Sequence, residues 1–361
     1  MSAFFQNINR RPDWEIYREN MAFADLADPL GFDSIWGAEH HFSDYTMCPN
    51  VTQFLTYMAA RSSRLLLGSM VTVLPWHEPV RVAEETAVLD TLSDGRVLLG
   101  LGRGVGRVEF DNLRLPMGES RQRFAEYAEA IIGALETGTI QHQGEFYRQP
   151  PTPIRPRPRH SFRGRIYAAA VSPESSKLMA RLGVGLLIIP QKPWDTTLRE
   201  LQVYRETYLA INGVEAPPPI VVSWVACHED AAAAEAMKEK YIRRYCKSAM
   251  DHYDFASPEL ASIPGYEYYG RMSQRIRAQG EDTFIDFLTE MNVWGTPRQC
   301  FDRIMSYQKM LNANGFVGVF NYGGMPIEEA TKSARLFASE VLPRLKEVAV
   351  PGRVGALRLA A

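Results

Sequence analysis

The fold is decided by residues 65–101, which read LLLGSMVTVLPWHEPVRVAEETAVLDTLSDGRVLLGL. The apolar run Leu65–Leu74 has the length and composition of a buried strand. Val80–Leu92 carries apolar residues at helical spacing and stops at Asp94–Gly95. A second apolar run, Val97–Leu101, follows at once. Strand, helix and strand in this order predict a βαβ unit with parallel strands.

The same alternation repeats along the chain. Trp14–Leu30 is expected to be a helix with Asp13 as its N-cap, and apolar residues between Phe124 and Leu135 share one helical face. Eight βα units over 361 residues predict an α/β fold, a (β/α)8 TIM barrel, with an open doubly wound sheet as the alternative. The eight expected strands begin at Ala3, Ser34, Leu65, Val97, Ile166, Gly185, Pro219 and Phe316.

Two segments interrupt the alternation. Gln141–Arg165 is rich in proline and arginine and is expected to be a long surface loop. Lys247–Gly280 is polar, aromatic and marked by Gly and Pro, which predicts an insertion before the last βα unit that acts as a lid. We therefore expect one barrel domain over residues 1–345, with the insertion at about 247–280, and a C-terminal tail at 346–361.

The composition excludes several classes of protein. Forty basic and 42 acidic side chains give a formal net charge of −2, which does not indicate binding to nucleic acid or to anionic lipid. No apolar run approaches the roughly 18 residues of a membrane span. The four cysteines are scattered, without a CxxC pair, so neither a disulfide framework nor a zinc knuckle is expected. A cytoplasmic enzyme or binding protein remains.

Candidate site residues follow directly on the expected strands. His40, Trp76, Arg103, Ser172 and Gln191 each come just after a strand. In a TIM barrel the carboxyl ends of all strands meet at one face, where active sites lie. A histidine, an arginine, hydroxyls and aromatic rings collected on one face would suit a phosphorylated aromatic cofactor.

The second expected strand leads into Glu39-His40-His41-Phe42. Neighbouring residues of an extended chain point to opposite sides, so His40 and His41 cannot easily share one metal ion, and no HExxH spacing is present. We therefore predict no metal site. The two histidines are then either polar loop residues or one of them, His40, is a general acid/base at the barrel mouth.

The fourth expected strand ends in a glycine-rich loop, Gly100–Gly106. Its glycine spacing matches neither a dinucleotide fingerprint nor a P-loop. The loop is either a flexible strand exit or a place where a ligand approaches the backbone, with Arg103 offering a fork to a phosphate. The hydroxyls of Ser172 and Ser175 either cap a helix or help to hold that phosphate.

Several aromatic residues could line an apolar pocket or belong to the core. The residues that we assign to a substrate pocket are Phe42, Tyr45, Trp76 and Trp224.

The order of these motifs resembles the bacterial luciferase-like flavin-dependent monooxygenases, over about residues 3–345. The segments that carry the resemblance are GFDSIW at 31–36, EHHF at 39–42, VLP at 73–75, PVRVAEE at 79–85, LD at 89–90, SDGR at 93–96, GRG at 102–104, ESR at 119–121 and GTP at 295–297. The ordered set is specific, although no single piece is.

The resemblance implies a cofactor and the residues that hold it. Reduced FMN is expected, with its phosphate held by arginines and serines, a non-prolyl cis peptide beneath the flavin ring, and His40 as the catalytic histidine. The implied cofactor-binding residues are Met70, Val71, Gly102, Arg103, Arg121, Ser172 and Ser175. Bacterial luciferase itself has a reactive cysteine at the position of Gly102, so light emission from an aldehyde is not expected.

The resemblance also implies an activity and partners. We expect an FMN-dependent monooxygenase that oxygenates a small organic substrate with molecular oxygen through a flavin hydroperoxide. The reduced FMN would come from a separate NAD(P)H flavin reductase. A homodimer is expected, formed through the helices that follow the second and third strands. A deazaflavin-dependent oxidoreductase on the same barrel and a non-catalytic flavin-binding subunit are the alternatives.

Overall fold

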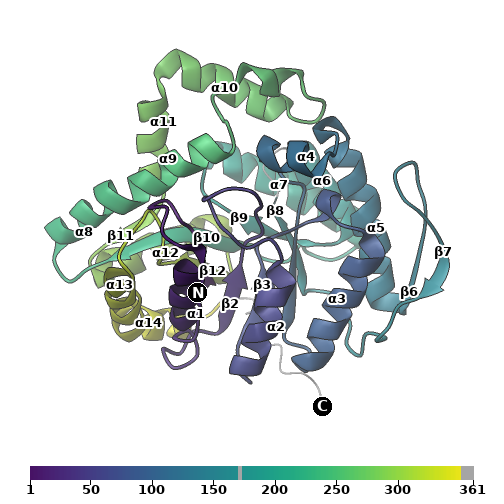
Figure 1. Cartoon of the computed structure of the whole chain (residues 1–361), viewed down its shortest axis with the longest axis horizontal. Coiled ribbons are helices and arrows are strands. Elements are labelled where there is room, and N and C mark those ends of the chain that lie inside the picture. Colours follow the sequence, from purple (N-terminus) through teal and green to yellow (C-terminus); the bar gives the residue numbers. More distant parts are fainter. Residues whose placement is uncertain (170–172, 351–361) are drawn as a thin grey trace.

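The computed structural model describes residues 1–169 and 173–350, and its centre is a closed ring of eight parallel strands (Figure 1). Going around the ring from β1, each strand pairs with the next, and β10 closes it by pairing with both β9 and β12. The strands of the ring are β1 (Ser2–Ala3), β2 (Ser34–Gly37), β3 (Leu66–Ser69), β5 (Val97–Gly102), β8 (Ile166–Ala169), β9 (Gly185–Ile188), β10 (Ile220–Cys227) and β12 (Gly315–Val319). The predicted (β/α)8 barrel is confirmed, and the open sheet is excluded.

Two short strands add to the ring: one lies inside an expected strand, and the other was not expected. The expected long strand Leu65–Leu74 is divided into β3, β4 (Thr72–Val73) and the start of a 3-10 turn, Leu74–Trp76. The Met70–Val71 peptide between β3 and β4 is cis, as the resemblance implies. The other strand, β11 (Val293–Gly295), pairs with the end of β10. Three residues are too short a run to show strand periodicity in the sequence.

Most of the helices surround the ring on its outside, and those within residues 243–290 lie over one end of it (Figure 1). Before β10 these are α1 (Asp13–Ala24), α2 (Val51–Arg61), α3 (Pro79–Leu92), α4 (Arg107–Leu113), α5 (Ser120–Thr137), α6 (Pro173–Leu182) and α7 (Trp194–Asn212). After β10 they are α8 (Ala231–Met237), α9 (Arg243–His252), α10 (Glu267–Gln279), α11 (Glu281–Glu290), α12 (Pro297–Leu311), α13 (Ile327–Glu340) and α14 (Leu342–Glu347).

Local chemistry sets several helix ends. The Asn50 side chain accepts from the Gln53 amide and caps α2, and Thr296 and Gln299 form a capping box at α12. Gly138 ends α5 in the left-handed conformation that glycine tolerates. The first helix differs from the expectation: Asp13 is its first residue, Pro12 is the cap, and it ends at Ala24 rather than Leu30.

The proline-rich segment expected to be a loop contains a hairpin. Strands β6 (Thr139–Gln143) and β7 (Arg148–Pro153) pair antiparallel, apart from the barrel. Proline is confined to sheet edges, so a strand with three prolines shows no strand signal in the sequence. The two-stranded ribbon consists of edges only and can accept them.

The segment 247–280 is largely helical rather than irregular. It comprises the end of α9, a 3-10 turn (Pro258–Ser262) and α10. Together α9, α10 and α11 lie at one end of the molecule, at the top of Figure 1. Residues of α9 and α10 line the same cavity as the strand ends, so this segment covers the carboxyl face of the barrel. Its assignment as an insertion stays a prediction.

The barrel interior is filled by apolar side chains. Trp36 of β2 is 1% exposed and lies against Gly68 of β3, where a Cβ atom would come within 2.2 Å of its ring. A glycine is therefore required at position 68 for this packing. None of the described helices is both long and apolar enough to cross a membrane.

Candidate active site

A cavity of about 220 Å³ opens where the carboxyl ends of the strands meet the α9–α10 segment. Residues from the loops after β2, β4 and β5 line it together with side chains of β10, α9 and α10. This is the face of a (β/α)8 barrel at which active sites lie. The cavity therefore stands where the sequence predicts the site.

His40 lies at the rim of this cavity, three residues after the end of β2. Its Nδ1 is 2.8 Å from Oε1 of Glu109, and its Nε2 is 3.1 Å from the hydroxyl of Tyr253. The side chain is 12% exposed. An imidazole held at both nitrogens has a fixed orientation, which is what a positioned proton donor or acceptor requires.

Glu109 anchors the histidine from beneath. It lies in the first turn of α4, is fully buried, and also accepts from the backbone N–H of His41 at 3.1 Å. Burial by itself raises the pKa of Glu109, but the neighbouring His40 and His252 outweigh this and lower it to about 2. Glu109 is therefore an anion at neutral pH, and it favours a proton on the Nδ1 of His40.

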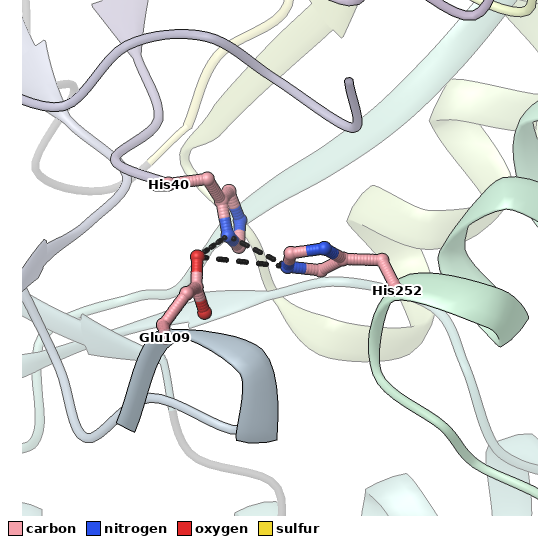
Figure 2. A group of neighbouring side chains, drawn as sticks. All are labelled: His40, Glu109 and His252. Atoms are coloured by element: carbon pink, nitrogen blue, oxygen red, sulfur yellow. Dashed lines mark hydrogen bonds and ion pairs between the residues drawn. The ribbon is translucent and has the colours of Figure 1, made fainter. Parts of the chain in front are cut away.

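A second histidine completes this cluster. His252, the last residue of α9, places its Nε2 3.1 Å from Nδ1 of His40 and 3.6 Å from Oε1 of Glu109 (Figure 2). Its Nδ1 is 3.1 Å from Oγ of Ser43, and its ring stacks on Tyr45 at 4.5 Å between centroids. Burial lowers the pKa of His252, and the nearby His40 lowers it further against the opposing effect of Glu109. It is therefore a neutral imidazole at neutral pH.

A separate network surrounds Glu39. One carboxylate oxygen of this buried side chain lies 2.6 Å from Nε2 of His77 and 3.1 Å from Nε2 of His41, and the other accepts from the Val73 amide at 2.8 Å. These contacts lower the pKa of Glu39 although burial opposes them. His40 and His41 thus have different carboxylate partners, as their opposite directions on the chain predict.

Two arginines converge at another part of the cavity. Arg103, directly after β5, and Arg121, in the first turn of α5, donate to the Gly265 carbonyl at 2.7 and 2.8 Å. The Arg103 guanidinium also stacks on Tyr266 at 4.1 Å. Nε of Arg121 is buried without an acceptor among the described residues. This pair offers N–H donors and positive charge to an anionic group.

Aromatic rings form the apolar wall. Trp224 stacks on Tyr245 with 3.9 Å between ring centroids, and the Tyr245 hydroxyl is 3.0 Å from that of Tyr45. The indole N–H groups of Trp76 and Trp224 are buried and have no acceptor among the described residues. Both tryptophans line the cavity, so a ligand there could accept from them.

Most of the predicted site residues meet around this one cavity. Those that line it are His40, Tyr45, Met70, Val71, Trp76, Gly102, Arg103, Arg121, Ser175 and Trp224. Ser172 lies outside the described residues. Phe42 is a correction: it is 58% exposed and is not among the lining residues, because its backbone has a φ of 59° and its ring packs on His41 outside the pocket.

Sequence reasoning missed Glu109, His252, Tyr253 and Gly265. Glu109 follows Arg103 by six residues and reads as one charge on an ordinary helix. The other three lie in the segment expected to be a polar insertion. Aromatic residues and a histidine in such a segment were the available signal, but nothing in the sequence indicates which of them face the barrel.

The chain belongs to the luciferase-like monooxygenase family, whose model matches residues 2–313. This family includes FMN-dependent monooxygenases and F420-dependent enzymes. The (β/α)8 fold agrees with that membership.

Two curated relatives cover nearly the whole chain. The alkanal monooxygenase alpha chain of Aliivibrio fischeri is 25% identical over 329 residues, which cover 88% of this chain and 90% of that protein. The oxygenase component of the flavin-dependent trigonelline monooxygenase of Acinetobacter baylyi is 24% identical over 358 residues, covering 94% and 92%.

Among solved structures with this fold, one is described in complex with FMN and another as dependent on coenzyme F420. The monooxygenase RslO1 of Streptomyces bottropensis superimposes with a TM-score of 0.75 at 25% identity and covers 95% of this chain and 98% of its own. The oxygenating constituent of the Pseudomonas putida 3,6-diketocamphane monooxygenase, solved with FMN, gives 0.71 at 17%, covering 94% and 96%. The coenzyme F420-dependent tetrahydromethanopterin reductase of Methanopyrus kandleri gives 0.63 at 20%, covering 91% and 95%.

Proposed function

We propose that this chain is the oxygenase component of a two-component, FMN-dependent monooxygenase. One observation carries the proposal: three buried N–H groups without an acceptor among the described residues, on Trp76, Arg121 and Trp224, all line the cavity. A buried donor without a partner costs about 1–3 kcal/mol, so the three together favour a ligand rich in acceptors. A flavin mononucleotide, with ring carbonyls, ribityl hydroxyls and a phosphate, is such a ligand.

The arginine pair supports the phosphate end of this assignment. Arg103 and Arg121 each donate an N–H to the Gly265 carbonyl, which is a neutral acceptor. A phosphate would be a stronger partner for both. Ser175, in the first turn of α6, lines the same cavity. The proposed phosphate site also includes Ser172, which is not among the residues that the structure describes. Gly102 and the Met70–Val71 peptide would lie against the flavin ring.

His40 is the proposed acid/base group. Reduced FMN, when bound, supplies the electrons that activate molecular oxygen. Glu109 fixes the imidazole through Nδ1, which leaves Nε2 and the Tyr253 hydroxyl at the cavity to give or take a proton. The aromatic wall around Tyr45, Trp76 and Trp224 would exclude water and receive a small organic substrate.

The proposal includes partners. The trigonelline relative is named an oxygenase component, which supports a separate NAD(P)H flavin reductase as the source of reduced FMN. Apolar side chains are exposed on two neighbouring helices, Tyr57 on α2 and Val88 and Leu92 on α3. They support a homodimer through these helices, which sedimentation of the wild type and of a Leu92→Glu variant would test.

The experiment combines a reductase that supplies reduced FMN with ¹⁸O₂ and a panel of ketones, aromatic acids and aldehydes. The proposal predicts a product that carries one ¹⁸O atom and depends on the chain. If reduced F420 supports turnover and reduced FMN does not, the chain is a deazaflavin oxidoreductase instead. If neither flavin binds, the assignment of the cavity is wrong.

A further inference from the structure

Three potential metal ligands converge beside the cavity. Figure 2 shows Nδ1 of His40, Nε2 of His252 and one oxygen of Glu109 turned toward one another. Nδ1 of His40 lies 2.8 Å from Oε1 of Glu109 and 3.1 Å from Nε2 of His252, and the last two atoms are 3.6 Å apart. Zinc–ligand bonds of about 2.0–2.1 Å at tetrahedral angles place neighbouring ligand atoms roughly 3.3 Å apart. The triangle therefore already has the size of one face of a zinc tetrahedron.

The outer nitrogens of both histidines are arranged as metal sites require. Nε2 of His40 lies 3.1 Å from the Tyr253 hydroxyl, and Nδ1 of His252 lies 3.1 Å from Oγ of Ser43. A histidine that binds a metal through one nitrogen usually donates its other N–H to an oxygen, which fixes the tautomer. Both hydroxyls can accept, so both inner nitrogens can present lone pairs.

Without a metal ion, hydrogen bonds among these three side chains do not satisfy all of their polar atoms. If Nδ1 of His40 donates to Glu109, the 3.6 Å between His252 Nε2 and Glu109 Oε1 remains longer than a normal hydrogen bond. The second oxygen of Glu109 is buried without a partner among the described residues. Gly106 leaves the space that the cluster needs, because a Cβ there would come within 2.2 Å of that oxygen and 3.1 Å of His252 Nε2.

We propose that His40, Glu109 and His252 form a binding site for one divalent transition-metal ion, with Zn²⁺ as the best-suited ion. Two imidazoles and a carboxylate are ligands that Zn²⁺ prefers over Mg²⁺ or Ca²⁺. Metal ligands must be deprotonated, so the ion and protons would compete for these three side chains. Metal binding does not require the flavin, but it shares His40 with the proposed acid/base function, and a metal on Nδ1 would fix the proton of His40 on Nε2.

Metal binding to the full chain, stripped of metals and free of flavin, tests this. Zn²⁺ binding is measured by calorimetry, and Co²⁺ binding by its visible absorption, which reports tetrahedral nitrogen and oxygen ligation. We expect one ion per chain. Loss of an outer-shell partner usually weakens metal affinity about 10–100-fold, so Ser43→Ala should do that, and His252→Ala and Glu109→Gln at least as much.

His77→Asn is the matched control, because it breaks the neighbouring histidine–carboxylate contact with Glu39 and leaves the three ligands intact. Its affinity should equal that of the wild type. Circular dichroism shows whether the variants are folded, and Ser43→Ala keeps the test informative if a ligand variant is not. Absence of stoichiometric binding by the wild type would overturn the proposal, and so would a folded His252→Ala variant with unchanged affinity.

Discussion

Nδ1 of His40 lies 2.8 Å from Oε1 of Glu109, although 69 residues separate them in the chain. His40 follows β2, and Glu109 lies in the first turn of α4, after β5. Since β2 and β5 both pair with β3, the barrel brings their carboxyl ends to neighbouring positions. The contact turns a loop histidine into an oriented group beside a buried anion, which is the basis of the function proposed for it.

Replacing His40 by Ala should reduce product formation by about 10²–10⁴-fold, which is the usual contribution of a positioned histidine. Hydrogen peroxide should rise, because oxygen would still react with the bound reduced flavin. Product and peroxide are measured with a reductase that supplies reduced FMN. His41→Ala, which removes a partner of Glu39 instead, should cost less. A larger loss for His41→Ala would contradict the assignment.

The carboxylate of Glu109 should make the protein sensitive to acid. Its pKa is lowered from 4.5 to about 2 in the folded chain, so its contribution is complete above about pH 4.5 and is lost as the pH falls toward 2. The shift corresponds to on the order of 3 kcal/mol. The free energy of unfolding, measured against urea between pH 6 and pH 3, should fall less steeply for Glu109→Gln. If the free energy of unfolding of the wild type and of Glu109→Gln fell equally with pH, the lowered pKa of Glu109 would be refuted.

Arg121→Ala should weaken the binding of FMN about ten- to a hundredfold, the effect of losing charge-assisted hydrogen bonds to a phosphate. Arg103→Ala should act in the same direction. Riboflavin has the same ring without the phosphate, so its dissociation constant, followed by flavin fluorescence, should change little. Equal losses for FMN and riboflavin would place the arginines away from the phosphate.

Two glycine substitutions should have different effects, one on FMN binding and the other on stability. A Cβ at Gly102 would come within 2.1 Å of Cγ2 of Val71. Gly102→Ala should therefore displace Val71, which lines the cavity, and weaken FMN binding. A Cβ at Gly133, inside α5, would meet nothing within 4 Å. Gly133→Ala should therefore stabilise the protein by about 0.5–1 kcal/mol and leave FMN affinity unchanged. Thermal unfolding and flavin titration of both variants check this.

The strands of the ring could be predicted from the sequence because parallel strands buried on both faces are short apolar runs. All eight strands of the ring were found in this way, and with them the placement of His40 and Arg103 at one face. The register of a barrel then brings such residues together without further information. Very short strands such as β11, and the proline-rich hairpin, lack the pattern on which the method depends.

The partners of the predicted residues could not be found in this way. His252 is separated from His40 by 212 residues and lies at the end of a helix whose path over the barrel no local pattern specifies. The direction of Phe42 depends on a single left-handed backbone conformation, which a phenylalanine rarely adopts. The position of His252 and the direction of Phe42 both depend on the tertiary structure, which local sequence patterns do not show.

An anaerobic titration with reduced FMN and reduced F420 tests the central claim most directly. The two flavins differ in the chemistry that they support, and both are used by proteins with this fold. The account predicts saturable binding of reduced FMN at least tenfold tighter than that of reduced F420, and loss of this preference for FMN in Arg121→Ala. Tighter binding of reduced F420, or no binding of reduced FMN, would contradict it.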